Sequence, residues 1–447
     1  MSKIITAIDI GSYKISVAIA TVDDEGNIKI IGEAQQSSQG IKKGEVTGID
    51  DAVNPIALAL NSAERMAGIS VSSAYVSING RQVLSNNNKG VVAIAGSEVI
   101  ENDVYRAMEQ AKTIAIPNTR EIVHLIPREF IVDQQTGIKV PIGMTGNRLE
   151  VDAHIISFPI TSIHNLEKCV QSIGLKVDSF VFTGWASALA VLTPTEKELG
   201  VLLLDIGGGT VSVTMFMDDC VTYSASIPLG GINVTRDLAT GLRLSLDDAE
   251  KLKLSANDLL RQVHNSKRYK KTTKLDLEDY QSNEIMDGDR EIVDKEEYEG
   301  DIIDVSSLGI EGIKTISRKF FLQIINDRVE EILHIVKENI EQAGFSHKLP
   351  AGIVLTGGSS LLPSITSTVK NVLGVPARVA QPIGVSGLVN NISPSLAVTY
   401  GLIMYALQEE IQRGDNKYSG SLGKRGAISG DSIITKVFEL IRRVIPS

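Results

Sequence analysis

The stretch "GVLLLDIGGGTVSVTMF" at residues 200–216 decides the fold, because it places a glycine-rich turn between two apolar runs. Val201 to Leu204 are apolar and are followed by Asp205, and a second apolar run extends from Val211 to Phe216. Apolar runs on both sides of a short glycine turn are typical of a β-hairpin. The stretch therefore predicts a hairpin whose first strand ends at an aspartate.

The N-terminal segment "IITAIDIGSYKISVAIA" at residues 4–20 has the same design. An apolar strand reaches Asp9, a turn with one glycine follows Ile10, and the next strand alternates Ile15, Val17 and Ile19. A pattern that recurs far along a chain indicates related structural units. We therefore predict two related halves.

Both turns have residue types that bind phosphate. Glycines let the backbone approach an anion, and their N–H groups can surround phosphate oxygens. Hydroxyl donors and the Lys14 cation add to this, while Asp9 and Asp205 can hold Mg²⁺ through water. One such turn is explained equally well as an ordinary hairpin. Two of them, with a third turn at Thr356-Gly357-Gly358-Ser359, favour a nucleotide site, and the P-loop and GxGxxG patterns are absent from the sequence.

Further elements follow from hydrophobic spacing. "KGVVAIAG" (89–96) and "EIVHLIPREFIVD" (121–133) predict strands, and residues 102–115, 164–174 and 318–345 predict helices. Residues 351–365 predict a buried strand, a glycine turn and a helix. The segment 276–304 carries thirteen acidic and two basic residues. We expect it to be a solvated insert or, alternatively, a partner surface.

Composition limits the function classes. The chain has 447 residues and a formal net charge of −10, which argues against broad nucleic-acid binding. Its length suggests two to four domains. No apolar run reaches the roughly 20 residues that span a bilayer, and the N-terminus has no signal-peptide pattern. We expect Cys169 and Cys220 to be buried free thiols.

The end of the chain differs from the rest. Residues 414–431 contain five glycines and predict a flexible linker. On a helix, "SIITKVFELIRRVIPS" (432–447) forms an apolar stripe with a basic flank, which is typical of a helix in a membrane interface. A C-terminal helix packed on the core is the alternative. The residues predicted to contact lipid are Ile434, Val437, Phe438, Ile441, Arg442, Arg443 and Val444.

The sequence resembles the actin-like ATPase superfamily and, within it, the FtsA family of bacterial cell-division actin homologues. The most specific pieces are "IDIGSYKISVAIA", "ELGVLLLDIGGGT", "IINDRVEEIL" and "AGIVLTGGSSLLPSI", and the final linker and amphipathic helix also match. The resemblance implies a two-lobed α/β actin-like ATPase fold with ATP and Mg²⁺ in a cleft, and Asp9 and Asp205 beside the metal. The nucleotide-binding residues that it implies are Gly11, Ser12, Tyr13, Lys14, Gly207, Gly208, Gly209, Thr210, Glu250, Lys253, Gly357, Gly358 and Ser359.

Within this set, Glu250 and Lys253 resemble ribose and base contacts, with an exposed helix face as the alternative. Family members often have an acidic residue where this chain has Ser212. No catalytic residue is predicted, and at most weak ATP hydrolysis is expected.

The resemblance also implies domain boundaries. The first-lobe core comprises residues 1–82, 165–196 and 385–413, with an inserted subdomain at 83–164. The second-lobe core comprises residues 197–230 and 318–384. An outer subdomain at 231–317, a linker at 414–431 and a membrane-targeting helix at 432–447 complete the predicted organisation.

The implied function is a division protein on the cytoplasmic face of the membrane, at the division site. It binds ATP, polymerises and tethers FtsZ filaments through the FtsZ C-terminal tail. Membrane lipids and other division proteins are further expected partners. A related pilus-assembly protein and a metabolic kinase of the same fold are the alternatives.

Overall fold

The computed structural model describes residues 3–23, 25–113, 117–261, 301–344, 349–388 and 392–415. They form two compact units. Unit 1 consists of the described parts of Met1–Gly231, Ile335–Ser360 and Gly374–Ser447, and unit 2 of those of Ile232–His334 and Leu361–Leu373. Within the described residues, no helix is long and apolar enough to cross a membrane.

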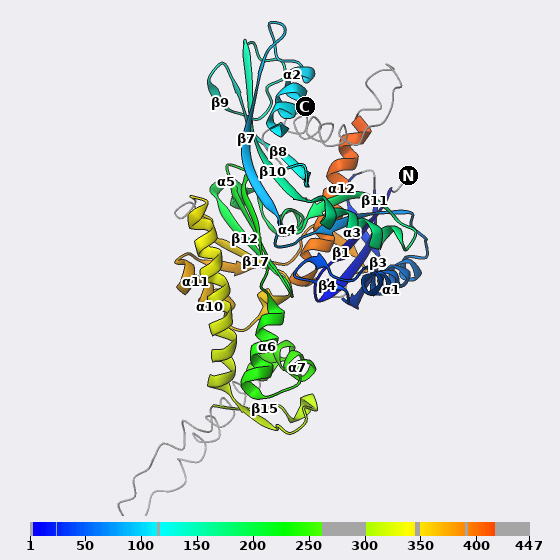
Figure 1. Ribbon diagram of the computed structural model, residues 1–447, viewed down its shortest axis with the longest axis vertical. Helices are drawn as coiled ribbons and strands as arrows, with labels where there is room; N and C mark the ends of the chain where they lie inside the picture. The colour runs from blue at the N-terminus through cyan, green and yellow to red at the C-terminus, as the bar shows by residue number, and fades with distance from the viewer. Residues whose placement is uncertain are drawn as a thin grey trace, which may run out of the picture. The chain divides into compact units, whose positions relative to one another are not determined.

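Unit 1 contains two sheets built on one plan (Figure 1). The first has the order β11-β6-β1-β2-β3, with β19 added at its edge, and the second has the order β18-β17-β12-β13-β14. In each sheet the glycine-turn hairpin pairs antiparallel with the strand that follows it and parallel with a later strand. The prediction of two related halves is confirmed at the level of strand order.

The strands of the first sheet are β1 (Lys3–Ile10), β2 (Lys14–Val22), β3 (Ile28–Ser37), β6 (Ser73–Ile78), β11 (Lys176–Phe182) and β19 (Val385–Gly387). Those of the second are β12 (Val201–Ile206), β13 (Val211–Met217), β14 (Cys220–Ile227), β17 (Ile353–Thr356) and β18 (Ala377–Val379). A small ribbon joins β4 (Ile41–Lys42) to β5 (Glu45–Val46).

Helices cover both faces of the first sheet, because successive strand residues point to opposite faces. Ile8 and Val17 pack with α1 (Ile49–Ala67) and α3 (Ile160–Gln171) in one core. Ala7 and Ala18 face the other side and pack with α12 (Ala397–Asp415). The second sheet shares a core with α4 (Thr183–Val191), which lies against α12, and α5 (Pro194–Leu199) precedes β12.

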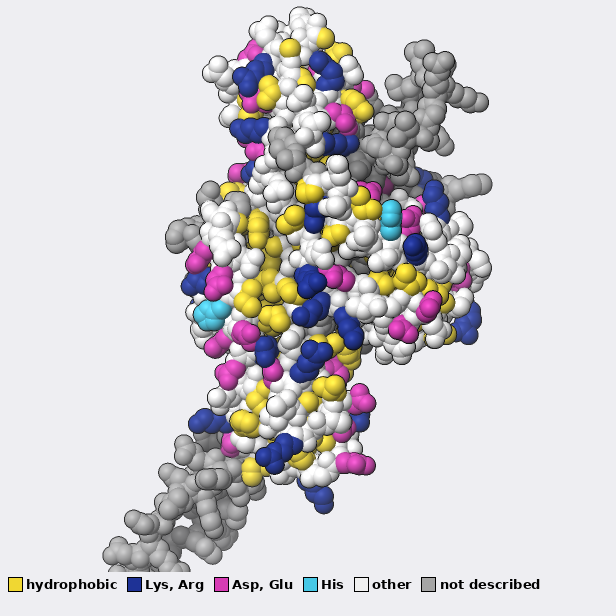
Figure 2. All heavy atoms as spheres, in the orientation of Figure 1, with side chains coloured by type: hydrophobic (Ala, Val, Ile, Leu, Met, Phe, Trp, Pro, Cys, Tyr) yellow, Lys and Arg dark blue, Asp and Glu magenta, His cyan; other side chains and the backbone are white. Residues whose placement is uncertain are grey.

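The inserted subdomain lies between β6 and β11 in the chain. Its sheet has the order β7-β10-β8-β9, formed by β7 (Leu84–Ala93), β10 (Arg148–Pro159), β8 (Arg120–Val132) and β9 (Gln135–Ile138). Helix α2 (Glu101–Lys112) packs Val104, Ala107 and Met108 against this sheet. The predicted strands and helix of this region are confirmed. On the face in Figure 2, acidic and basic side chains are interspersed over this subdomain, at the top of the view.

Unit 2 is mainly helical. It contains most of α6 (Gly231–Leu242), α7 (Leu246–Leu254) and α11 (Ile365–Leu373), with β15 (Ile302–Asp304) paired to β16 (Thr315–Ser317). The predicted long helix is α10 (Arg318–Gln342), whose last turns belong to unit 1. Arg328 on α10 forms two hydrogen bonds with the Asp237 carboxylate on α6, at 2.5 and 2.9 Å. Short 3₁₀ turns are η1 (Ser306–Leu308), η2 (Gly358–Leu361) and η3 (Pro394–Leu396).

Three predictions need comment at the level of the fold. Cys169 is buried as expected, but the expectation for Cys220 was wrong, because its side chain is only partly buried at the start of the edge strand β14. Helix α12 continues through Asp415, so the first two residues of the predicted linker are helical. The rest of the linker, the membrane-targeting helix and residues 276–300 of the acidic segment lie outside the described residues.

Candidate functional site

The two predicted phosphate turns lie against each other in unit 1. Each turn closes with the same hydrogen bond: the Gly11 N–H donates to the Lys14 carbonyl at 3.1 Å, and the Gly207 N–H donates to the Thr210 carbonyl at 2.9 Å. A Cβ atom on Gly208 would lie 2.4 Å from Tyr13 Cβ, and one on Gly209 would lie 2.7 Å from Ser12 Oγ. Glycine is therefore required where the turns approach each other.

Each strand that leads into one of these turns has an aspartate as its last residue but one. Asp205 is 6 % exposed, and Asp9 is partly buried and accepts a hydrogen bond from Ser77 Oγ at 2.8 Å. Burial, and then the charge of Asp9, raise the pKa of Asp205 to about 7, although Ser187 and Lys14 act in the opposite direction. Burial also raises the pKa of Asp9. The two negative charges are thus close enough to oppose each other, as in a cation site.

Lys14 supplies the positive charge next to this pair. Its Nζ donates to Gln35 Oε1 and to Ser395 Oγ, both at 3.1 Å. Burial lowers the pKa of Lys14, and the charges of Asp9, Glu33 and Asp205 partly offset this effect. The ammonium group is therefore held by weak neutral acceptors, and an incoming phosphate is a stronger partner for it.

The third predicted turn lies beside the second. Gly357 has a φ of +82°, and a Cβ atom there would lie 2.4 Å from Asp205 Oδ1. Ser359 Oγ donates to the Gly207 carbonyl at 3.1 Å, and the Gly357 N–H donates to the Pro394 carbonyl at 3.1 Å. The structure thus brings together Asp9, Lys14, Asp205 and the three glycine turns, and their assignment to a nucleotide site stays a prediction.

Sequence reasoning missed several side chains around the turns. Asn79 follows β6 and donates through Nδ2 to Thr210 Oγ1 at 3.0 Å and to Ser212 Oγ at 2.9 Å. Ser212 is 2 % exposed and also shares a hydrogen bond with Thr183 Oγ1 at 2.7 Å. Position 212, where the family resemblance led us to expect a carboxylate, is therefore occupied by a hydroxyl within a buried hydrogen-bond network. An Asn-Gly pair directly after an apolar strand was the only local signal for Asn79.

Glu250 and Lys253 lie on α7 in unit 2. They form an ion pair with 2.7 Å between Lys253 Nζ and Glu250 Oε2, and Lys253 Nζ also donates to Thr235 Oγ1 at 3.0 Å. Both side chains are largely buried, with exposures of 9 % for Lys253 and 16 % for Glu250, so the alternative of an exposed helix face does not describe them. Their roles toward ribose and base stay predictions. The seven predicted lipid-contacting residues lie outside the described residues.

The donor set fits Mg²⁺ with a retained hydration shell. Asp9 and Asp205 are hard oxygen ligands close to each other, and Ser12 and Thr210 add hydroxyl oxygens in the adjacent turns. Within the described ranges, no group of three or more His, Cys, Asp or Glu side chains is arranged to hold a metal ion. The two aspartates therefore suit a metal that is also held by water and by phosphate.

Comparison with known proteins identifies the family. The family described as "Cell division protein FtsA" matches residues 202–401, and the "SHS2 domain inserted in FTSA" matches residues 80–157. The chain belongs to the FtsA family. The FtsA protein of Pseudomonas aeruginosa is 31 % identical over 99 % of this chain and 97 % of its own length. The FtsA protein of Bacillus subtilis is 34 % identical over 91 % of this chain and 84 % of its own.

Solved structures agree with the actin-like fold of the FtsA family. A chain of the PilM–PilN type IV pilus biogenesis complex superposes with a TM-score of 0.58 at 15 % identity, covering 90 % of this chain and 98 % of the other. MreB5 of Spiroplasma citri, solved bound to ADP, gives a TM-score of 0.50 at 11 % identity, with coverage of 94 % and 99 %. At these identities the likeness concerns the fold alone. The predicted α/β actin-like fold with an inserted subdomain is confirmed.

Proposed function

We propose that this FtsA-family protein binds ATP with Mg²⁺ at the paired glycine turns. The observation that carries the proposal is the duplicated hairpin. Two turns closed by the same hydrogen bond lie in contact, and each follows a strand whose last residue but one is an aspartate. The nucleotide-bound MreB5, whose fold is similar, supports the choice of ligand.

In this proposal the residues have distinct tasks. Backbone N–H groups of the two turns and the hydroxyls of Ser12 and Thr210 hold phosphate oxygens, and Lys14 exchanges its neutral partners for phosphate. Asp9 and Asp205 would hold Mg²⁺ through its water ligands, and the chemistry that the metal would supply is neutralisation of phosphate charge. Because Ser212 occurs where a carboxylate is common in relatives, we propose weak hydrolysis at most.

We further propose that the protein polymerises and tethers FtsZ filaments to the cytoplasmic membrane at the division site. Membership of a cell-division family supports this role, and the FtsZ C-terminal tail and other division proteins are the proposed partners. The amphipathic pattern of residues 432–447, with Arg442 and Arg443 on its flank, supports peripheral attachment to anionic lipid.

Titration of a fluorescent ATP analogue, with and without Mg²⁺, tests the nucleotide site. Asp9→Ala and Asp205→Ala should each weaken Mg²⁺-dependent binding, because each removes an anion that holds the metal's water shell. Asp50→Ala, which removes an exposed carboxylate on α1, is the matched control and should bind as the parent does. Unchanged Mg²⁺-dependent affinity in both site variants contradicts the assignment.

Liposome flotation with and without residues 432–447 tests the membrane role. Removal of the segment should abolish flotation with anionic vesicles and leave ATP affinity unchanged. An actin-fold metabolic kinase has no need of a lipid-binding segment, so a full-length chain that does not float favours that alternative.

A further inference from the structure

Asn79 connects the second phosphate turn to the start of the inserted subdomain. It lies between β6, which is part of the first sheet, and β7, which is the first strand of that subdomain. Its Nδ2 holds the hydroxyls of Thr210 and Ser212, and its own Oδ1 accepts the Gly80 N–H at 2.9 Å. All polar groups of this amide are therefore used in fixing the chain segment against the turn.

The same segment continues along the β13–β14 hairpin. Ser85 Oγ donates to the Ser224 carbonyl at 2.6 Å and accepts the Ser224 N–H at 3.2 Å. Asn87 Nδ2 donates to the Thr222 carbonyl at 2.9 Å. These are outward-facing groups of β14, the edge strand of the second sheet. Side chains of β7 thus form hydrogen bonds with backbone groups at an edge of the sheet where no further strand pairs.

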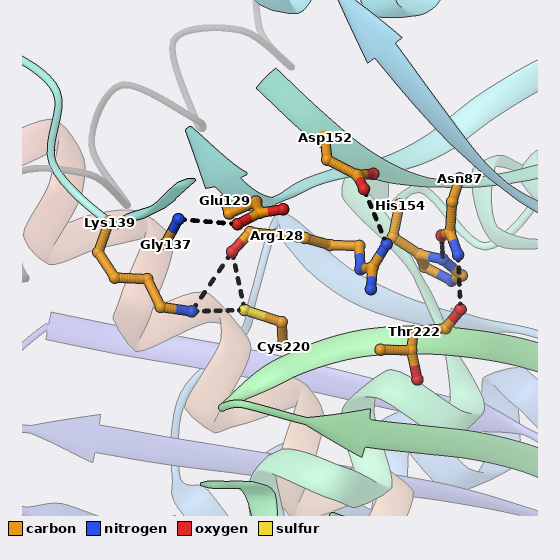
Figure 3. A network of polar contacts seen from close by, with 9 residues as sticks. All are labelled: Asn87, Arg128, Glu129, Gly137, Lys139, Asp152, His154, Cys220 and Thr222. Atoms are coloured by element: carbon orange, nitrogen blue, oxygen red, sulfur yellow. Dashed lines mark hydrogen bonds and ion pairs between the residues drawn. The ribbon is translucent and has the colours of Figure 1, made fainter. Parts of the chain in front are cut away.

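His154 on β10 lies beside Asn87 (Figure 3) and completes a seam of side chains between the two elements. We define this seam as Ser85, Asn87 and His154 against Thr222 and Ser224. Its Nδ1 lies 2.6 Å from Asn87 Oδ1, and its Nε2 lies 3.0 Å from Ser224 Oγ. Because Asn87 uses its amide N–H toward Thr222, its Oδ1 accepts from His154 Nδ1–H. Burial lowers the pKa of His154 to about 3, so the imidazole is neutral near pH 7 and its Nε2 accepts from the Ser224 hydroxyl.

A second contact lies at the other end of β14. Lys139 Nζ, just after β9, donates to the Asp218 carbonyl at 2.9 Å and lies 2.7 Å from Cys220 Sγ. Cys220 Sγ in turn donates to the Arg128 carbonyl of β8 at 3.0 Å (Figure 3). Three strands of the inserted subdomain thus contact the hairpin that carries the second phosphate turn.

The pairing of β13 with β14 links the contacts of Asn79 to those of the seam. Ser212, which Asn79 holds, pairs with Ser226, and Thr214 pairs with Ser224, which Ser85 holds. A shift of the turn at residues 207–210 moves β13, and β14 moves with it because the two strands share backbone hydrogen bonds. The inserted subdomain contacts β14, so a shift of β14 also shifts the inserted subdomain.

We propose that Asn79 is a positioning residue for the second phosphate turn and that it couples nucleotide binding to the inserted subdomain through the β13–β14 hairpin and the seam. The proposal rests on the proposed ATP site. The Thr210 hydroxyl accepts from Asn79 and keeps its own proton, which it can donate to a bound phosphate. A bound phosphate therefore extends the same chain of hydrogen bonds and strengthens the contact between Asn79 and the turn, so nucleotide changes how firmly the inserted subdomain is held.

Amide hydrogen exchange on the full chain, with and without saturating Mg-ATP, tests the coupling. Nucleotide should change exchange by at least about fivefold in peptides covering β7 and β10, equivalent to about 1 kcal/mol in local opening. In Asn79→Ala this change should disappear at saturating nucleotide. ATP affinity in this variant should fall roughly fivefold, which is the scale of one lost hydrogen bond.

A second variant cuts the seam instead. Ser85→Ala combined with Asn87→Ala should keep ATP affinity within about twofold and still lose the exchange response in β10. Asn86→Ala changes a neighbouring exposed asparagine on β7 and is the matched control. It should keep both the ATP affinity and the exchange response of the parent protein. An Asn79→Ala protein or a seam variant that retains the full response at saturation overturns the coupling.

The outcomes also separate this proposal from the site on which it rests. A parent protein that fails to bind ATP overturns both. A parent protein that binds ATP, with the same exchange in β7 and β10 whether free or bound, overturns the coupling alone. A purely structural role for Asn79 would lower the melting temperature and leave the nucleotide response intact, which also contradicts the proposal.

Discussion

Mg²⁺-dependent ATP binding should weaken as the pH falls below 8, because Asp205 must be ionised to hold the metal's water shell. Burial and the adjacent charge of Asp9 raise the pKa of Asp205 to about 7 in the ligand-free protein. A raised carboxyl pKa means that a proton competes with the metal near neutral pH. Affinity should therefore rise with pH through 7 and level off at higher pH.

The expected magnitude follows from the fraction of ionised Asp205. With a pKa of about 7, roughly nine-tenths of the carboxyl is ionised at pH 8 and roughly one-tenth at pH 6. Mg-ATP affinity should thus fall by about tenfold over this interval, or about 1.4 kcal/mol.

Titrations of a fluorescent ATP analogue at pH 6, 7 and 8 measure this effect. ATP phosphate itself titrates near pH 6, so a background profile is needed. Asp205→Asn supplies it, because the amide keeps the shape of the side chain and does not ionise. The variant should bind Mg-ATP more weakly at pH 8 and show a flatter profile. Identical profiles in the parent and in Asp205→Asn would refute the reasoning.

Four further predictions concern the rest of the protein. Steady ATP turnover should stay below about 1 s⁻¹, because the side chain at position 212 is a hydroxyl bound to Asn79 and Thr183 and not a carboxylate that could order the attacking water. A phosphate-release assay that finds faster turnover contradicts this. Phe438→Glu should lower partitioning into anionic liposomes at least about a hundredfold, since it loses apolar burial and adds a charge; a lower melting temperature with intact lipid binding would show a helix packed on the core instead. Electron microscopy of lipid monolayers with ATP should show protofilaments, and isolated particles at every concentration count against polymerisation. Finally, burial lowers the pKa of His154 to about 3 from 6.5. Because the unfolded chain binds the proton first, stability should fall as the pH decreases from 6.5 toward 3, by up to about 1.4 kcal/mol per pH unit from this residue. Chemical denaturation of the parent and of His154→Gln at pH 7 and pH 5 isolates the slope, which should be smaller in the variant.

Local patterns were enough to predict the two hairpins and their turns. The information lies within one short stretch each: an apolar strand, an aspartate, a glycine turn and a second strand. The long helix α10 was predictable for the same reason, since its apolar stripe repeats over many turns. The first two glycine turns meet because the equivalent strands β1 and β12 of two similar sheets carry them, and their recurrence in the sequence indicated that arrangement. The third turn follows β17, the parallel neighbour of β12.

Contacts between distant parts of the chain were not predictable in this way. Asn79 reaches Thr210 across 131 positions, and Ser77 reaches Asp9 across 68. Neither residue has a periodicity or a spacing that marks its partner. The exposure of Cys220 was also not predictable from local sequence. Its apolar neighbours indicated burial, but it lies at the start of an edge strand and is partly exposed. Such positions depend on strand order, which no single segment of this sequence specifies.

A crystal structure of the protein with ATP and Mg²⁺ tests the central claim most directly. The account predicts that the phosphates lie between the turns at residues 11–14 and 207–210, with Lys14 on a phosphate oxygen and water-bound Mg²⁺ beside Asp9 and Asp205. Gly357 and Gly358 should then lie next to the adenosine. Nucleotide bound elsewhere, or a metal that does not approach either aspartate, would contradict it.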